Sequence, residues 1–158
     1  MPVKYQAKYL PSVDPYRDTE VIDQRAPRTL QASVSTITAL AFVFDLWPLA
    51  TLVGLQLIIG LVFGRRWCLP CVFYFEVIQP RRGEGRIEDS RPPRFANIVG
   101  ATFLMTATVL FIAGATTAGW VLTLIVTTLA GFAAVSGICV GCELYVAFAR
   151  LRGTRLAA

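Results

Sequence analysis

Apolar and charged residues are segregated along this chain rather than mixed. Every Lys and Arg lies in one of three blocks, residues 4–28, 65–94 and 150–155, and two apolar stretches, residues 29–64 and 95–149, separate these blocks. A helix needs about 20 apolar residues to cross the roughly 30 Å core of a bilayer. Each apolar stretch is therefore long enough for two helices, and the pattern predicts four membrane spans.

Each apolar stretch contains a turn signal that divides it into a helical hairpin. The first is Asp45-Leu-Trp-Pro48, which combines a charge, an interfacial aromatic residue and a helix stop, and the second is the small-residue segment 113–119. We therefore predict an all-α fold, a four-helix transmembrane bundle formed by residues 29–150. The predicted spans are approximately residues 30–47, 49–64, 95–113 and 120–140. The other predicted segments are an N-terminal segment, a central loop and a tail, residues 1–28, 79–94 and 151–158.

The positive charges give this bundle an orientation. The three basic blocks hold all fifteen Lys and Arg residues of the chain, and neither hairpin tip has one. Because Lys and Arg are enriched on the cytoplasmic side of membrane proteins, we expect the central loop and both termini in the cytoplasm, in a multi-pass protein of the inner (plasma) membrane. The formal net charge of +5 does not indicate a nucleic-acid partner, since the basic residues flank apolar spans that the lipid bilayer would surround.

The two halves of the chain resemble each other. Pro27-Arg28 precedes the first hairpin, and Pro93-Arg94 precedes the second. Each hairpin is followed by a Cys-x-x-Cys-x-x-Tyr motif, and the two motifs match at one constant offset. The bundle is thus predicted to consist of two similar hairpins related by a pseudo-twofold axis along the membrane normal.

The cysteines of the two halves are expected at the same depth. Helix two runs from Leu49 to Cys68 and helix four from Trp120 to Cys139, which is about 28 Å in each case at the rise of an α-helix. Both pairs should therefore reach the cytoplasmic boundary of the bilayer. Within a pair, the spacing of three residues places both sulfurs on one helical face.

Two kinds of chemistry fit these cysteines. A Cys-x-x-Cys pair can cycle between dithiol and disulfide, so Cys68, Cys71, Cys139 and Cys142 are candidate catalytic residues. A permanent structural disulfide is disfavoured in the cytoplasm, where thiols are kept reduced. Alternatively, the same four thiolates could hold one tetrahedral zinc, one iron or an iron–sulfur cluster. The sequence leaves both alternatives open.

Charged neighbours distinguish the two pairs. Arg65 and Arg66 lie just before Cys68, and a nearby cation lowers the pKa of a thiol, so Cys68 is the predicted reactive thiol unless these arginines only anchor the membrane boundary. Pro70 should break helix two, which then restarts around the first pair. In the second pair, Glu143 adjoins Cys142, where it disfavours the thiolate and could relay a proton.

A tyrosine follows each cysteine pair at the same spacing. Tyr74 and Tyr145 are predicted to anchor the protein at the membrane interface, where amphipathic rings are enriched. A direct role at the cysteine sites is the alternative. Histidine is missing from the sequence, so neither haem ligation nor base catalysis by an imidazole is available.

Three segments carry a further signal. They are Ile22-Asp-Gln-Arg-Ala-Pro-Arg28, Arg91-Pro-Pro-Arg-Phe-Ala96 and Gly137-Ile-Cys-Val-Gly-Cys-Glu-Leu-Tyr145. In them the chain resembles, over about residues 20–147, a bacterial four-helix integral membrane family catalogued only as a domain of unknown function. Members of that family are often found beside rhodanese-type sulfurtransferases and thioredoxin-like proteins. The resemblance therefore implies sulfur or thiol redox traffic, and it applies directly to Cys139 and Cys142.

The leading hypothesis is an integral membrane thiol-redox or sulfur-relay protein. Its cysteines would exchange electrons or sulfane sulfur with a soluble thioredoxin-like or sulfurtransferase partner, with a quinone in the bilayer as a further electron carrier. The alternative is a non-catalytic small subunit of a larger membrane complex, in which the four cysteines bind a structural metal, zinc or iron. The first hypothesis describes an enzyme and the second does not.

Overall fold

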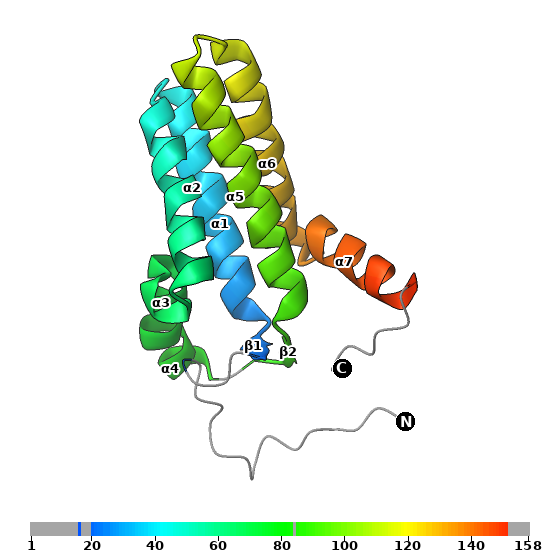
Figure 1. The fold of residues 1–158 in the computed structure, drawn as a ribbon. Coiled ribbons are helices and arrows are strands. Elements are labelled where there is room, and N and C mark those ends of the chain that lie inside the picture. The colour runs from blue at the N-terminus through cyan, green and yellow to red at the C-terminus, as the bar shows by residue number, and fades with distance from the viewer. Residues whose placement is uncertain (1–15, 17–19, 84, 152–158) are drawn as a thin grey trace.

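The computed structural model describes residue 16, residues 20–83 and residues 85–151. The protein is mostly helical, as predicted, and four long helices run side by side (Figure 1). Helix α1 packs against α2 and α6, and α5 packs against the same two helices, so each half of the chain contacts the other along its length. The four helices are α1 Arg25–Val43, α2 Trp47–Val62, α5 Arg91–Ile112 and α6 Thr116–Ser136.

The turn between α1 and α2 lies at the predicted break, but the helix ends differ from the prediction. Helix α1 already ends at Val43, and Trp47 begins α2 instead of ending the first helix. Pro48 falls in the first turn of α2, where its missing N–H removes no helical hydrogen bond. Asp45 adopts a left-handed conformation with φ of 53°, which reverses the chain between the two helices.

Each half of the chain begins with a short strand that the sequence pattern did not reveal. Strand β1, Val21–Asp23, pairs with β2, Ile87–Asp89, in antiparallel register with Ile22 opposite Glu88. Residues assigned above to the N-terminal segment and the central loop therefore form a two-stranded sheet. Strands of three residues are too short for an alternating pattern to be recognised.

The strands extend the internal repeat. Strands β1 and β2 each lead directly into the first long helix of their half. Each strand also ends in an aspartate, and the Oδ1 of this aspartate accepts a hydrogen bond from the backbone N–H two residues later. Arg25 donates to Asp23 at 2.9 Å, and Arg91 donates to Asp89 at 2.8 Å. The antiparallel pairing is symmetric about the Ile22–Glu88 pair. A local twofold axis through this pair therefore relates the start of α1 to the start of α5.

The segment between α2 and β2 is folded rather than a loop. Helix α2 ends at Val62, Gly64 adopts φ of 87°, and the chain restarts as short helical turns, as Pro70 predicted. Gln56 of α2 fixes this restart because its Nε2 donates to the carbonyl of Trp67 at 2.7 Å. The turns are η1 Arg65–Trp67, α3 Leu69–Phe73, the π-helical η2 Tyr74–Ile78 and α4 Gln79–Arg82.

A buried carboxylate joins this segment to the strands. Asp23 is 7% exposed, and its Oδ2 accepts hydrogen bonds from the hydroxyl of Tyr74 at 2.8 Å and from the N–H of Gly85 at 2.9 Å. Burial and the hydrogen bond to Asp23 raise the pKa of Tyr74 above its usual value. Tyr74 is therefore a core residue, and its predicted role as an interfacial anchor is wrong, because its hydroxyl is needed to satisfy Asp23.

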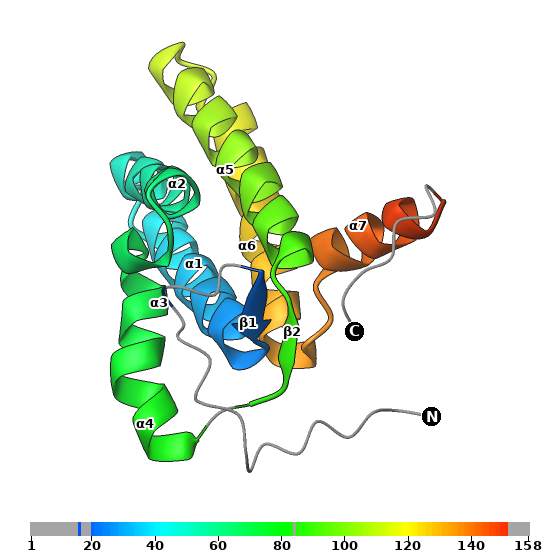
Figure 2. The ribbon, with the colours of Figure 1, turned by 60° about the horizontal axis from the view of Figure 1, so that its bottom comes forward.

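Large apolar side chains cover the outside of the long helices. Helices α5 and α6 are each long and apolar enough, by length and composition, to cross a membrane, and α2 is a shorter apolar helix. The most exposed apolar side chains on these helices include Leu52, Val62, Val109, Ile112 and Val135. Helix α7, Val140–Leu151, leaves the four long helices and extends to one side of them (Figures 1 and 2).

The two equivalent aspartates provide a test of this arrangement. Asp23→Ala should lower the free energy of unfolding more than Asp89→Ala, because it leaves the buried Tyr74 hydroxyl and the Gly85 N–H without an acceptor, at about 1–3 kcal/mol for a buried unsatisfied donor. Asp89→Ala removes the equivalent hydrogen bond to the N–H of Arg91 at a half-buried position, where water can replace the lost acceptor, and should cost about 1 kcal/mol. Chemical denaturation of the purified variants measures both. Equal losses would contradict a special role for Asp23.

Candidate functional site

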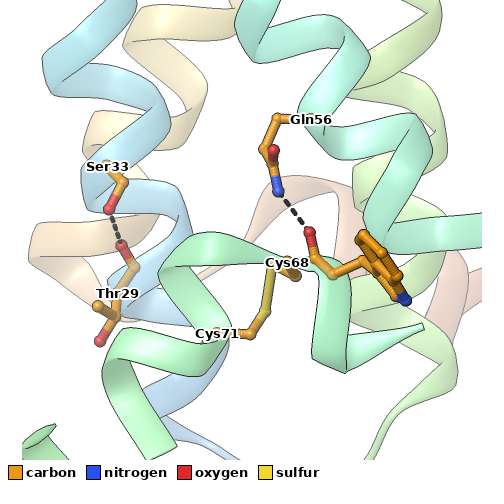
Figure 3. Close-up of a disulfide and its surroundings, with 6 residues drawn as sticks. Thr29, Ser33, Gln56, Cys68 and Cys71 are labelled. Carbon is orange, nitrogen blue, oxygen red and sulfur yellow. Dashed lines mark hydrogen bonds between the residues drawn. A yellow bond between two sulfur atoms is a disulfide. The ribbon is translucent and has the colours of Figure 1, made fainter. Parts of the chain in front are cut away.

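The first cysteine pair forms a disulfide. Cys68 and Cys71 are bonded, with their Cα atoms 5.2 Å apart, and both are buried. Cys68 is the residue just before α3, and Cys71 lies in the first turn of α3. The disulfide therefore links the two residues at the point where the chain becomes helical again after α2 (Figure 3). The bond is the oxidised state of a Cys-x-x-Cys pair, and it fits the predicted cycle between dithiol and disulfide. In this state Cys68 has no free thiol, so the reactivity predicted for it stays a prediction.

The disulfide borders a cavity of about 120 Å³ at the base of the long helices. A Cβ on Gly60 would lie 3.2 Å from the Cβ of Cys68, so the glycine allows the pair to approach α2 closely. Arg94 and Asn97 of α5 line the same cavity, although they belong to the other half of the chain. The cavity of the first pair is thus also lined by the guanidinium of Arg94 and the side-chain amide of Asn97, both from the second half of the chain.

The two arginines before Cys68 have different surroundings. Arg65 lines the disulfide cavity, and its Nη2 donates to the carbonyl of Val21 in β1 at 2.7 Å. The guanidinium of exposed Arg66 lies over the ring of Tyr16, 5.4 Å from its centroid. Arg65 therefore ties the cysteine segment to the strands, whereas Arg66 stacks on an aromatic ring.

The second pair lies where the chain leaves α6. The predicted span 120–140 ends early, at Ser136, because Gly137 adopts a left-handed φ of 74° and stops the helix. Cys139 then stands immediately before α7, as Cys68 stands immediately before α3. The glycine is a common helix-end signal, and it could have revealed this boundary from sequence.

Cys139 and Cys142 are free thiols of unequal acidity. The pKa of Cys139 is lowered to about 6, chiefly because the thiol of Cys142 donates a hydrogen bond to it. The backbone N–H groups of Cys142 and Gly141 and the side chain of Gln31 add to this effect, while burial opposes it. The hydrogen bonds thus favour the thiolate of Cys139, the form that attacks disulfides and sulfane sulfur.

Cys142 is the partner thiol. Its pKa is raised by the hydrogen bond that it donates to Cys139, by burial, and by the negative charges of Cys139, Glu143 and Glu88. The charge of Glu143 thus disfavours the Cys142 thiolate, as predicted, whereas the proton relay expected of Glu143 stays a prediction. Cys142 therefore keeps its proton at neutral pH. A protonated Cys142 can donate a hydrogen bond to the Cys139 thiolate before it takes part in the reaction itself.

Side chains of α1 complete the second site. Gln31 hydrogen-bonds Cys139, and the guanidinium of Arg28 packs over Gly137, where a Cβ would lie 2.5 Å from its Nη2. The Nε of Arg28 is buried and has no hydrogen-bond partner among the described residues. Arg28 and Gln31 stand at the same repeat positions as Arg94 and Asn97. Sequence reasoning missed these four residues, although the repeated Pro-Arg dipeptide points to them.

The structure does not bring the four cysteines together. Helix α3 and helix α7 lie on opposite sides of the β1–β2 pair (Figure 2). Helix α7 packs instead on α5, where the ring of Tyr145 lies 5.5 Å from that of Phe95. Within the described part of the chain, no three cysteine or carboxylate side chains group closely enough to hold a metal ion. The two pairs are therefore two sites, and the single four-cysteine metal centre finds no support.

The fold and the cysteines define a helical protein with an internal repeat, in which each half presents a Cys-x-x-Cys pair after its second long helix. Residues 22–150 match the family described as Domain of unknown function (DUF4395), and the chain belongs to that family. The comparisons with curated proteins and with solved structures gave no match. The family match thus includes both cysteine pairs, and it assigns no activity.

The acidity of Cys139 leads to a prediction for pH dependence. Because its pKa is lowered to about 6, the thiolate should be present at neutral pH and should be lost only as the pH falls through about 6. Iodoacetamide alkylation, followed by mass spectrometry in a Cys142→Ser background that keeps a hydroxyl donor, should therefore reach half of its plateau rate well below the pH of an ordinary cysteine. An ordinary cysteine would do so near pH 8.5, as roughly expected for a solvated thiol.

A matched variant isolates the cause. Cys142→Ala removes the hydrogen-bond donor that Cys142→Ser retains, so it should move the inflection of the alkylation profile towards higher pH. Identical profiles for the two variants would show that Cys142 does not lower the pKa of Cys139.

Proposed function

We propose that this protein is an integral membrane thiol–disulfide oxidoreductase with two separate cysteine sites. The observation that supports it best is that two copies of one motif, each just after the second long helix of its half, are in opposite redox states. The first pair is a disulfide, and the second is a dithiol with an acidic thiol. A non-catalytic subunit with a structural metal would instead need all four thiolates close enough to bind one metal ion.

Several features favour insertion of the four long helices in a bilayer. Helices α5 and α6 are long and apolar enough to cross, and exposed apolar side chains cover the outside of the helices. The strands and short helices at one end contain many arginines, whereas the tip at the other end has Asp45 and the aromatic cluster of Trp47, Phe111 and Trp120. This charge distribution favours cytoplasmic cysteine pairs.

Helix α7 would then lie in the membrane interface. Its exposed apolar residues Leu144, Phe148 and Leu151 recur at helical spacing, and it extends sideways from the bundle next to the arginine-rich end (Figure 2). Such a helix places its apolar face in the head-group boundary and its polar face in water. Cys139, at the start of α7, would be reachable both from the cytoplasm and from the bilayer.

The proposed exchange follows the acidity of the thiols. The Cys139 thiolate attacks one sulfur of a partner disulfide and forms a mixed disulfide, and the other partner sulfur leaves as a thiolate that takes up a proton. Cys142 loses its proton and attacks Cys139, which closes a Cys139–Cys142 disulfide and releases the second partner thiol. Two electrons pass to the partner, for which a thioredoxin-like protein is the proposed class.

Exchange with a defined disulfide tests this function. The reduced protein in lipid nanodiscs should reduce oxidised glutathione, and Cys139→Ser should slow the reaction by about 100-fold, because the thiolate is the nucleophile. Cys142→Ser should instead stop at one glutathione attached to Cys139, visible as a mass increase of the intact chain. Similar behaviour of the two serine variants, or no reaction of the wild-type protein, would contradict the proposal.

The membrane orientation is tested separately. Alkaline phosphatase fused after Thr117, in the turn region at the start of α6, should be active because that end faces outside. The same enzyme fused after Gly83 should be inactive, and green fluorescent protein should give the reverse result at the two positions. Active phosphatase at Gly83 would overturn the four-span orientation.

A further inference from the structure

A second cavity has in its wall Val140 and Gly141, the two residues between Cys139 and Cys142, although neither cysteine lines it. It has a volume of about 120 Å³ and is bounded by α1, α5, α6 and the start of α7, with Leu57 of α2 at its inner end. Most of its wall is apolar, and four of the apolar wall residues are also exposed at the surface, namely Val99, Ile125, Leu129 and Val140. In the proposed orientation the cavity therefore opens towards the lipid.

The polar groups of this cavity are few and lie near the cysteines. Gln31 and Asn97 provide two side-chain amides, and Gln31 also hydrogen-bonds Cys139. Val140 and Gly141, the first residues of α7, form the adjoining wall. A ligand held by the amides would thus be separated from the Cys139–Cys142 pair only by Gln31 and by the two residues between the cysteines.

The size of the cavity limits its ligand. An engineered apolar cavity of roughly 150 Å³ binds one benzene molecule, so a cavity of this order holds a single six-membered ring and excludes a nucleotide or a flavin. Apolar walls with a small number of placed polar groups are typical of small-molecule sites. Amide N–H groups are suited to donate to carbonyl oxygens on such a ring.

We propose that this cavity binds the ring of a lipid-soluble quinone, which accepts electrons from the Cys139–Cys142 dithiol. The inference rests on the proposed thiol–disulfide function and names a substrate for that site. The isoprenoid tail would leave the cavity past its exposed apolar wall residues and remain in the bilayer. The hydrocarbon part of a lipid chain would fill the apolar part, but it has no acceptor for the amides of Gln31 and Asn97, whereas a quinone ring carries two carbonyl oxygens.

The reaction balances without another oxidant. The Cys139 thiolate and the Cys142 thiol join in a disulfide, and their two electrons pass to the quinone ring. The ring takes two protons, one from Cys142 and one from water, and leaves as the hydroquinone. A partner dithiol would then restore the second pair by the reverse of the exchange described above, so that electrons run from the partner to the quinone.

Gly100 allows the cavity to be closed without touching a cysteine. A Cβ at this position would have only the Cδ1 of Leu57 nearby, at 3.8 Å, so a larger side chain could extend into the cavity. Val109 is on the same helix and is exposed, so Val109→Leu adds bulk outside the cavity and serves as the matched control.

The experiment follows reduction of decylubiquinone by absorbance, using protein in nanodiscs whose second pair has been reduced and freed of reductant. The wild type and Val109→Leu should reduce one quinone per chain. Gly100→Leu should be slower by about 10-fold or more, because an overpacked cavity no longer admits the ring. Leu129→Phe, which narrows the opening from an exposed position, should also be slower.

Cys139 alkylation and glutathione exchange separate this inference from the proposed function. Both should remain at wild-type level in Gly100→Leu, which also shows that the variant is folded. A reactive dithiol that does not reduce decylubiquinone, or equal rates in wild type, Gly100→Leu and Leu129→Phe, overturns the quinone site and leaves the exchange function intact. Failure of both glutathione exchange and quinone reduction in the wild type overturns the two proposals together.

Discussion

The buried carboxylate of Asp23 determines how the parts of the molecule around the disulfide are joined. A buried carboxylate requires hydrogen-bond donors, and Asp23 receives them from Arg25, Tyr74 and Gly85. These residues belong to α1, to η2 and to the segment before β2, which are far apart in sequence. The same carboxylate thus fixes the first helix, the residues after Cys71 and the connection between the halves.

Two copies of one short motif acquire different chemistry because their surroundings differ. Cys68 and Cys71 are buried against α2, and the helix that follows Cys68 has only five residues. Cys139 and Cys142 are half-exposed, and a helix of twelve residues follows Cys139. Backbone N–H groups at that helix start and the thiol of Cys142 stabilise the Cys139 thiolate, so the second pair favours nucleophilic chemistry.

The halves of the protein depend on each other at both sites. Helix α1 supplies Arg28 and Gln31 to the second pair, and α5 supplies the equivalent arginine and amide to the cavity of the first pair. The cavities at the two sites also share Leu30, Leu57 and Asn97 as wall residues. A ligand in one cavity would therefore contact side chains that line the other, which gives the two proposed redox sites a direct physical connection.

The sequence alone determined the helical class, the hairpin turns and the restart at Pro70, because helix periodicity, proline and charge segregation are local properties of the chain. Tertiary structure decided which thiols are free. The sequence favoured Cys68 from two adjacent arginines, yet Arg65 binds the carbonyl of Val21 and the acidic thiol is Cys139. The pKa of a thiol depends on donors brought from distant segments, such as Gln31, and on burial, and neither can be read from the neighbouring residues.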